Sequence, residues 1–121
     1  MATRSVDPRS FLPLTPLAFQ VMLALADVDR HGYGIIGEVE ERTDGLIRLR
    51  TGTLYTLLQR LLDQALIEQT AGSSTPPPDK DDPRRKYYRL TTLGREVLTA
   101  EARRLEAVLG DARRKHVIGR A

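Results

Sequence analysis

Arg50-Thr51-Gly52-Thr53-Leu54-Tyr55 opens the segment whose residue pattern decides the fold. From this point apolar residues recur three and four positions apart, which places them on one face of a helix. These residues are Leu54, Leu57, Leu58, Leu61, Leu62 and Ala65. We therefore expect an amphipathic helix that ends near Gln64, with Thr51 as its N-cap.

The opposite face of this helix carries hydrogen-bonding groups and few charges. Its residues are Thr53, Tyr55, Thr56, Gln59, Arg60 and Asp63. A helix that reads base edges in a DNA major groove needs short or planar polar side chains of this kind, with its first turn nearest the bases. Gly52 would let another backbone, such as a phosphate strand, approach the helix start. Taken alone, the pattern fits an ordinary amphipathic core helix equally well.

Length and composition indicate one domain without covalent cross-links. The chain has 121 residues, enough for a single core, and no cysteine, so neither disulfides nor thiolate metal sites are available. No apolar run reaches the roughly 18 residues of a membrane span. The polar N-terminus is unlike a signal peptide. We expect a cytoplasmic protein that does not associate with a membrane.

The formal net charge of +3 is unevenly distributed along the sequence. Acidic residues concentrate early in the chain, and basic residues gather later. The later basic residues are Arg48, Arg50, Arg84, Arg85, Lys86, Arg89, Arg103, Arg104, Arg113, Arg114 and Lys115. This asymmetry favours a polyanionic partner.

Two helices are predicted before the deciding segment. Thr15-Pro16 supplies an N-cap with proline at the first helical position, and Leu17 to Ala26 is apolar nearly all round. A helix of this kind must be covered on several sides, so we expect a second subunit to contribute. A turn over 27–32 leads to a second helix from about Tyr33 to Thr43, which Asp44-Gly45 ends.

Short strands and a long helix are predicted for the rest of the chain. Leu46 to Arg50 alternates apolar and basic residues, as a short strand does. Leu66 to Thr70 and Lys86 to Thr91 form a predicted hairpin. Its tip, residues 71–85, is unusually long and contains three consecutive prolines. A final helix should run from Thr92 to about His116.

The final helix carries the spacing of a coiled-coil seam. Its seam residues lie four and three positions apart: Leu98, Ala102, Leu105, Leu109, Ala112 and His116. A helix with such a seam at the end of a small domain pairs with another chain. We therefore expect a homodimer interface made of Leu17, Val21, Leu98, Ala102, Leu105, Leu109 and Ala112.

The order of the elements is that of a winged helix-turn-helix protein. We expect a mostly α fold with a small β-hairpin. It comprises a flexible lead-in over 1–14, a DNA-binding domain over 15–91 and a dimerisation helix over 92–121. The basic residues of the wing are Lys80 at its tip and Arg84, Arg85 and Lys86 at its base. They suit DNA phosphates, and the alternative is an edge strand charged against aggregation.

No pattern in the sequence indicates catalysis. Glu38, Glu40 and Glu41 form a solvated helix face without the convergent pairing that acid–base chemistry requires. A glycine-rich phosphate loop and a nucleophile elbow are both missing. His31 directly precedes a helix, where a capping or hydrogen-bonding role is expected rather than a metal-binding one. We expect no enzymatic activity, no metal and no cofactor.

Three separated runs resemble the PadR family. They are His31-Gly32-Tyr33-Gly34-Ile35-Ile36, Thr51-Gly52-Thr53-Leu54-Tyr55 with Leu58 and Leu61, and Arg85-Lys86-Tyr87-Tyr88-Arg89-Leu90-Thr91 with Gly94 and Arg95. With the final helix, the resemblance covers roughly residues 15 to 115. It implies a bacterial transcriptional regulator, usually a repressor. Such a regulator acts on an inverted-repeat operator as a homodimer joined through its last and first helices.

The resemblance also implies DNA contacts from the start of the third helix, which carry over to Gly52, Thr53 and Tyr55. Some family members release DNA on binding phenolic acids or drugs, so a small hydrophobic or phenolic effector is an expected partner. Two features depart from the family pattern: the longer, proline-rich wing tip and the lack of tryptophan. The second disfavours stacking of flat drugs at a dimer interface.

The sequence thus predicts a dimeric repressor that binds double-stranded DNA. We expect base contacts from Tyr55, Thr56 and Gln59, and backbone contacts from the helix start and the wing. The full predicted set is Tyr33, Arg50, Thr51, Gly52, Thr53, Tyr55, Thr56, Gln59, Arg60, Lys80, Arg84, Arg85 and Lys86. Two alternatives stay open: a small-molecule sensor with a pocket between the first and last helices, and a protein–protein adaptor.

Overall fold

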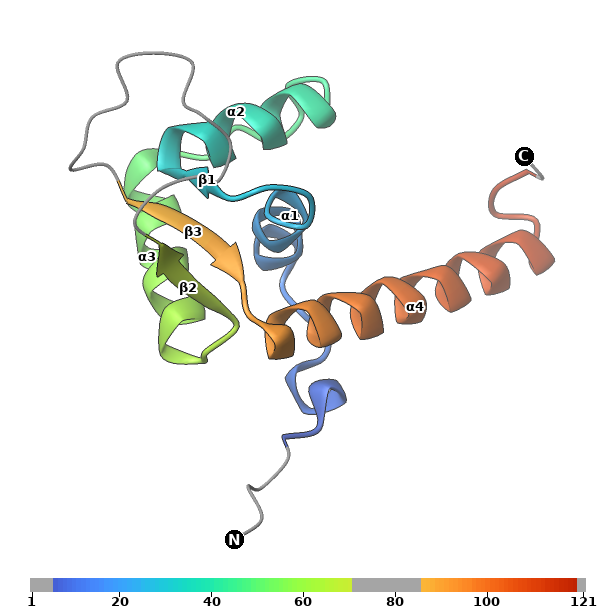
Figure 1. The fold of residues 1–121 in the computed structure, drawn as a ribbon. Helices are drawn as coiled ribbons and strands as arrows, with labels where there is room; N and C mark the ends of the chain where they lie inside the picture. The colour runs from blue at the N-terminus through green and yellow to red at the C-terminus, as the bar shows by residue number, and fades with distance from the viewer. Residues whose placement is uncertain (1–5, 71–85, 120–121) are drawn as a thin grey trace, which may run out of the picture.

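A computed structural model of the chain describes residues 6–70 and 86–119 (Figure 1). Its helices are η1 (Pro8–Phe11, a 3-10 helix), α1 (Pro16–Ala24), α2 (Gly32–Arg42), α3 (Thr51–Asp63) and α4 (Thr92–Arg114). Its strands are β1 (Arg30–His31), β2 (Ile67–Thr70) and β3 (Tyr87–Leu90). The mostly α fold with a small β-hairpin is confirmed. The predicted wing tip, with Lys80, Arg84 and Arg85, lies outside the described residues.

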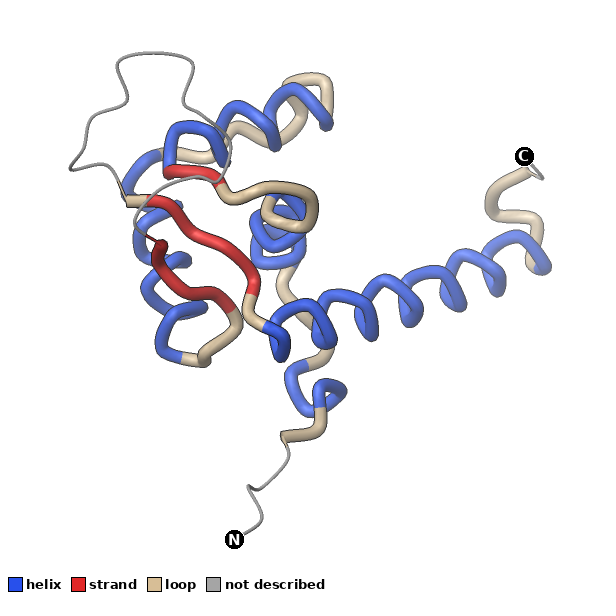
Figure 2. Tube along the Cα trace, viewed as in Figure 1, coloured by secondary structure: helices blue, strands red, loops and turns tan. Residues whose placement is uncertain are grey.

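The sheet of the described residues has three strands, and one of them, β1, is not predicted from the sequence. All pairings are antiparallel and the order is β1-β3-β2 (Figure 2). β2 and β3 form the expected hairpin, with Ile67 opposite Leu90. β1 lies in the predicted turn over 27–32 and pairs Arg30 with Tyr88. Two residues are too few for the alternation that identifies a strand in a sequence.

The strand predicted over Leu46 to Arg50 is wrong. The segment is extended, with Leu49 buried and Leu46 85% exposed, but it pairs with no other described strand. The alternation of apolar and basic residues therefore reflects an extended backbone that buries the Leu49 side chain in the core. The third place in the sheet belongs to β1 instead.

The helix caps follow the sequence prediction in part. The side chain of Thr15 accepts a hydrogen bond from the Ala18 amide at 3.1 Å, which confirms the start of α1. α3 begins one residue earlier than predicted: Arg50 is its N-cap, without a side-chain hydrogen bond, and Thr51 is its first residue. The sequence predicts Ala65 and His116 on helix faces, but both lie beyond helix ends, with φ of 62° and 63°.

The core lies between α1, α2, α3, the sheet and the first half of α4. Its largest fully buried side chains are Met22, Ile35, Leu54, Leu58, Leu61, Leu66, Ile67, Glu101, Val21, Val39 and Val97. Gly94 permits a close approach, because a Cβ there would lie 2.9 Å from the Leu66 carbonyl carbon and closer still to its oxygen. Among the described residues, no helix is long and apolar enough to cross a membrane.

Within the lead-in that the sequence predicts over residues 1–14, Pro8–Phe11 forms η1, which packs against α4. The amide of Leu14 donates a 3.0 Å hydrogen bond to the Glu101 carboxylate, which is 1% exposed. Arg104 donates two further bonds to the same carboxylate, at 2.6 and 3.0 Å. The Arg104 hydrogen bonds lower the pKa of Glu101, against the opposing effect of burial.

We predict that Glu101→Gln lowers the free energy of unfolding at pH 7 by about 1–3 kcal/mol, because a buried charge-assisted network is broken. The folded-state pKa of Glu101 lies below the ordinary glutamate value of about 4.3. Its carboxylate therefore stabilises the fold above that value and loses this contribution as pH falls through the folded-state pKa. Urea titrations across pH 3–7 measure both effects.

Glu96→Gln is the matched control, since Glu96 lies exposed on the same helix. It should leave the unfolding free energy nearly unchanged. A difference between Glu101→Gln and the wild type that grows on acidification would contradict the assignment.

Candidate nucleic-acid interface

Helix α3 turns its polar face outward. Leu54, Leu57, Leu58 and Leu61 are between 0% and 8% exposed and point into the core. The six residues of the predicted reading face are all exposed: Thr53, Tyr55, Thr56, Gln59, Arg60 and Asp63. The amphipathic helix is thus confirmed, and it presents its hydrogen-bonding side to the outside of the chain.

Much of this face keeps its hydrogen-bonding capacity available. The Gln59 amide nitrogen donates to the Asp63 carboxylate at 2.9 Å, which leaves the amide oxygen of this exposed residue as an acceptor. In the described part of the chain, no side-chain hydrogen bond involves Thr53, Thr56 or Arg60. These three residues and the Gln59 oxygen together offer both donors and acceptors to a partner.

The start of α3 is open to approach. Arg50 makes no side-chain cap, so the first amides of the helix have no side-chain partner at the cap position. Thr51, Gly52 and Thr53 are exposed, and a Cβ built on Gly52 would meet nothing within 4 Å. The fold itself therefore does not require glycine at position 52.

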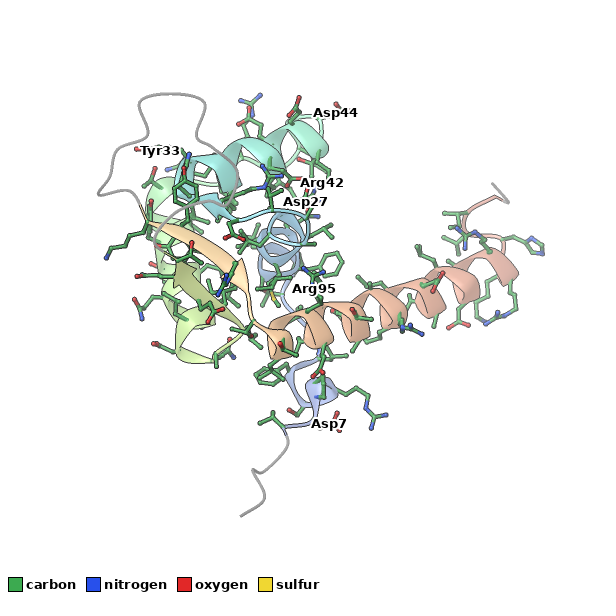
Figure 3. All side chains as sticks on the ribbon, viewed as in Figure 1. Asp7, Asp27, Tyr33, Arg42, Asp44 and Arg95 are labelled. Carbon is green, nitrogen blue, oxygen red and sulfur yellow. The ribbon has the colours of Figure 1, made fainter. Side chains whose placement is uncertain are left out.

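The start of α2 lies beside α3. The Nδ1 atom of His31 accepts a hydrogen bond from the Gly34 amide at 3.0 Å, which confirms the expected capping role. Tyr33 follows on the first turn and is 63% exposed, with its side chain directed away from the core (Figure 3). Tyr55 of α3 is 43% exposed, and its phenol lies across Gly32. The predicted residues Tyr33 and Tyr55 thus come from adjacent parts of two helices.

The basic residues that precede α3, lie on it or belong to the end of the hairpin differ in their availability. Arg48 lies 3.7 Å from Glu40, and Arg89 pairs with Glu68 at 2.8 Å. By contrast, Arg50, Arg60 and Lys86 are exposed and have no carboxylate partner among the residues that the structure describes. They are the cations best able to meet an external anion. The positions of Lys80, Arg84 and Arg85 stay a prediction.

A groove of about 730 Å³ runs beside the polar face, between the start of α1 and α3. Its lining residues are Thr15, Pro16, Leu17, Gly52, Thr53, Thr56, Leu57 and Arg60. The sequence does not predict that the start of α1 lies beside the polar face of α3. A pattern within one stretch of sequence does not indicate which turns of two helices, far apart in the chain, pack together.

The predicted dimer surface is exposed mainly on the second half of α4. That half extends beyond the rest of the described chain (Figure 1). Leu109 is 46% exposed, Ala102 is exposed, and Leu105 and Ala112 are half-buried. Leu17 is also half-buried.

Two of the predicted dimer residues belong to the core of a single chain. Val21 is 0% and Leu98 6% exposed, so they have no surface to offer a partner. The seam spacing predicts Leu98 and the apolar character of the first helix predicts Val21. Neither pattern distinguishes packing within one chain from packing between two.

The arrangement of α2, α3 and the β2–β3 hairpin is that of a winged helix-turn-helix domain. A family model described as "Transcriptional regulator PadR-like family" matches residues 21–100. The chain belongs to the PadR-like family of transcriptional regulators. It is therefore a regulator and not an enzyme, as the sequence predicts.

The chain is also similar in sequence or in fold to individual proteins. An uncharacterised protein of Lysinibacillus sphaericus is 34% identical over 79 residues, which is 65% of this chain and 68% of that protein. A PadR family transcription regulator from Clostridium difficile has 25% identity and a TM-score of 0.68, covering 83% of this chain and 97% of that one. Bacillus subtilis PadR in complex with operator DNA has 20% identity and a TM-score of 0.57, covering 73% of this chain and 47% of that one.

We predict that Gly52→Ala leaves the melting temperature unchanged or raises it slightly, because the position is open and alanine favours a helix. Gly94→Ala should instead abolish stable folding, since its Cβ would meet the Leu66 backbone. Circular dichroism melting curves measure both. A clear loss of stability in Gly52→Ala would show that the fold needs this glycine.

Proposed function

We propose that the chain represses transcription by binding a specific double-stranded DNA sequence through the polar face of α3. The observation that carries this proposal is the outward face of α3, where Thr53, Thr56, Gln59 and Arg60 are exposed. The side chains are those that recognise base edges and phosphates in a major groove. The operator complex of Bacillus subtilis PadR, which shares the fold, supports DNA as the partner.

The residues divide by the part of the DNA that they would contact. Thr56 and Gln59 lie on the exposed surface of α3 and would read bases, together with Tyr55. Thr51 to Thr53 at the helix start would bind phosphates, because helix amides and hydroxyls there favour an anion. Arg50 and Lys86, and the predicted cations of the wing, would add contacts to the DNA backbone.

The proposal includes a homodimer on an inverted repeat. Exposed apolar side chains on the second half of α4, including Val108 and Leu109 at 48% and 46%, support pairing with a second copy. A two-fold axis would set two α3 helices about 34 Å apart, one turn of DNA. Two such half-sites related by symmetry form an inverted repeat.

We predict different effects for Gln59→Ala and Lys86→Ala on DNA binding. Gln59→Ala should cost about 1–3 kcal/mol on the preferred sequence and relax selectivity at one base pair. Lys86→Ala should weaken all sequences alike and reduce the slope of log affinity against log salt by about one. Fluorescence anisotropy with a duplex from the upstream region of the gene and a random duplex measures both effects.

Glu96→Gln is the control for these titrations, because Glu96 lies on α4 and not on α3. Equal effects of Gln59→Ala on specific and random DNA would count against base reading. No DNA binding by the wild type at low salt would favour the protein–protein adaptor.

A small-molecule effector is a second part of the proposal, and the groove beside α3 favours it. Leu17 and Leu57 supply apolar lining and Arg60 a cation, so the groove suits a small apolar anion such as a phenolic acid. A ligand there would cover Thr53 and Thr56 and compete with DNA. Such a ligand shifts the equilibrium only through its differential affinity for free and DNA-bound protein.

We predict that at least one aromatic carboxylate in a phenolic panel raises the melting temperature of the wild type but not of Arg60→Ala. Thermal shift measurements test this. A flat response across the panel, or an equal shift in both proteins, would remove the effector from this groove.

A further inference from the structure

Gly32 is the first residue of α2. The side chain of Tyr55, from α3, packs directly against it. Gly32 is buried and does not adopt a positive φ, so its backbone conformation does not require glycine. The requirement is spatial. A Cβ at this position would lie 2.8 Å from the Cζ atom of Tyr55, and closer still to the hydroxyl oxygen.

Tyr55 lies where three elements, α3, α2 and β3, come together. It belongs to α3, lies across the start of α2, and is near enough to Tyr88 of β3 to affect its phenol. Burial, and then the neighbouring Tyr55, raise the pKa of Tyr88, while a hydrogen bond from Gln69 opposes this. Tyr88 in turn pairs with Arg30 of β1, which leads directly into Gly32. The Gly32–Tyr55 contact and the Arg30–Tyr88 pair thus lie where β1 leads into α2, next to α3.

We propose that Gly32 is a positioning residue for DNA recognition, because its missing side chain lets Tyr55 brace α3 against α2. The inference rests on the proposed function. Hydrogen bonds to base edges require reading side chains to be held within about 0.5 Å and 10–20° of the productive geometry. Tyr55 directly follows the first turn of α3, so this contact supports the turn that lies nearest the bases.

Alanine at position 32 would displace Tyr55 without disrupting the core. The atoms in its way are the far end of a side chain that is 43% exposed, so the phenol can swing outward into solvent. The leucines on the other face of α3 would stay buried. The expected result is a folded protein whose α3 has lost its brace against α2.

The first experiment is a double-mutant cycle on thermal stability. Gly32→Ala should lower the melting temperature by about 2–5 °C in the wild type. In a Tyr55→Ala background the same change should not lower it, because the obstructing phenol is gone. Gly37→Ala is the matched control: Gly37 is exposed on the same helix with nothing within 4 Å of its built Cβ. It should raise the melting temperature in both backgrounds.

The second experiment separates positioning from stability by measuring DNA selectivity. The probes are a duplex selected by the wild type from a randomised library and an unselected duplex of equal length, at a temperature where every variant is folded. Gly32→Ala should lose about tenfold in affinity for the selected duplex and less than about twofold for the unselected one, which corresponds to roughly 1 kcal/mol of lost discrimination. Gly37→Ala should change neither affinity.

Each of the two experiments has an outcome that would contradict the proposal. An equal fall in melting temperature with and without Tyr55 would refute the contact between Gly32 and Tyr55. Equal losses on both duplexes, or no loss on either, would refute the positioning role. If the wild type selects no duplex, the DNA-reading role fails together with the proposed function, while the stability cycle still decides the contact.

Discussion

The burial of four leucines on α3 determines which face of this helix is exposed to a partner. Leu54, Leu57, Leu58 and Leu61 are at most 8% exposed, and each contributes roughly 1.5–3 kcal/mol relative to an exposed side chain. Rotating α3 about its axis would expose these leucines and bury polar groups such as Arg60. The orientation of the polar face is therefore set by the core, before any partner binds.

Two close contacts at glycine residues determine how α3 and the residues after it pack against the other helices. Gly94 lets α4 begin against the Leu66 carbonyl, directly after the strands that follow α3. Gly32 lets Tyr55 lie across the start of α2. The runs His31 to Ile36 and Thr51 to Tyr55, which carry the family resemblance, therefore touch one another in space. Their glycine and tyrosine fit together as parts of one contact between two helices.

The sequence predicted those parts of the fold whose signals are local. The apolar spacing of α3 and the caps at Thr15 and His31 depend on residues within one or two turns, and the structure confirms them. It missed β1, because a two-residue strand is defined only by its distant partner β3. It also did not predict η1 or the hydrogen bond from the Leu14 amide to Glu101, which joins residues 87 positions apart.

The candidate site shows the same division. The exposed face of α3 followed from helical periodicity, whereas the groove between α1 and α3 required the packing of elements far apart in sequence. The seam spacing also predicts Leu98 for the dimer, and the apolar first helix predicts Val21, although the core of one chain buries both. Which chain covers an apolar face is a property of tertiary structure, and a spacing pattern does not contain it.

A distance between the two α3 helices tests the central claim most directly. The chain has no cysteine, so Gln64→Cys at the exposed end of α3 gives one spin label per copy. Double electron–electron resonance on the DNA-bound protein should give one narrow distribution in the range of about 30–40 Å, as half-sites one helical turn apart require. A distribution without that distance, or no dipolar signal at all, would contradict a dimer that presents two reading helices to one face of DNA.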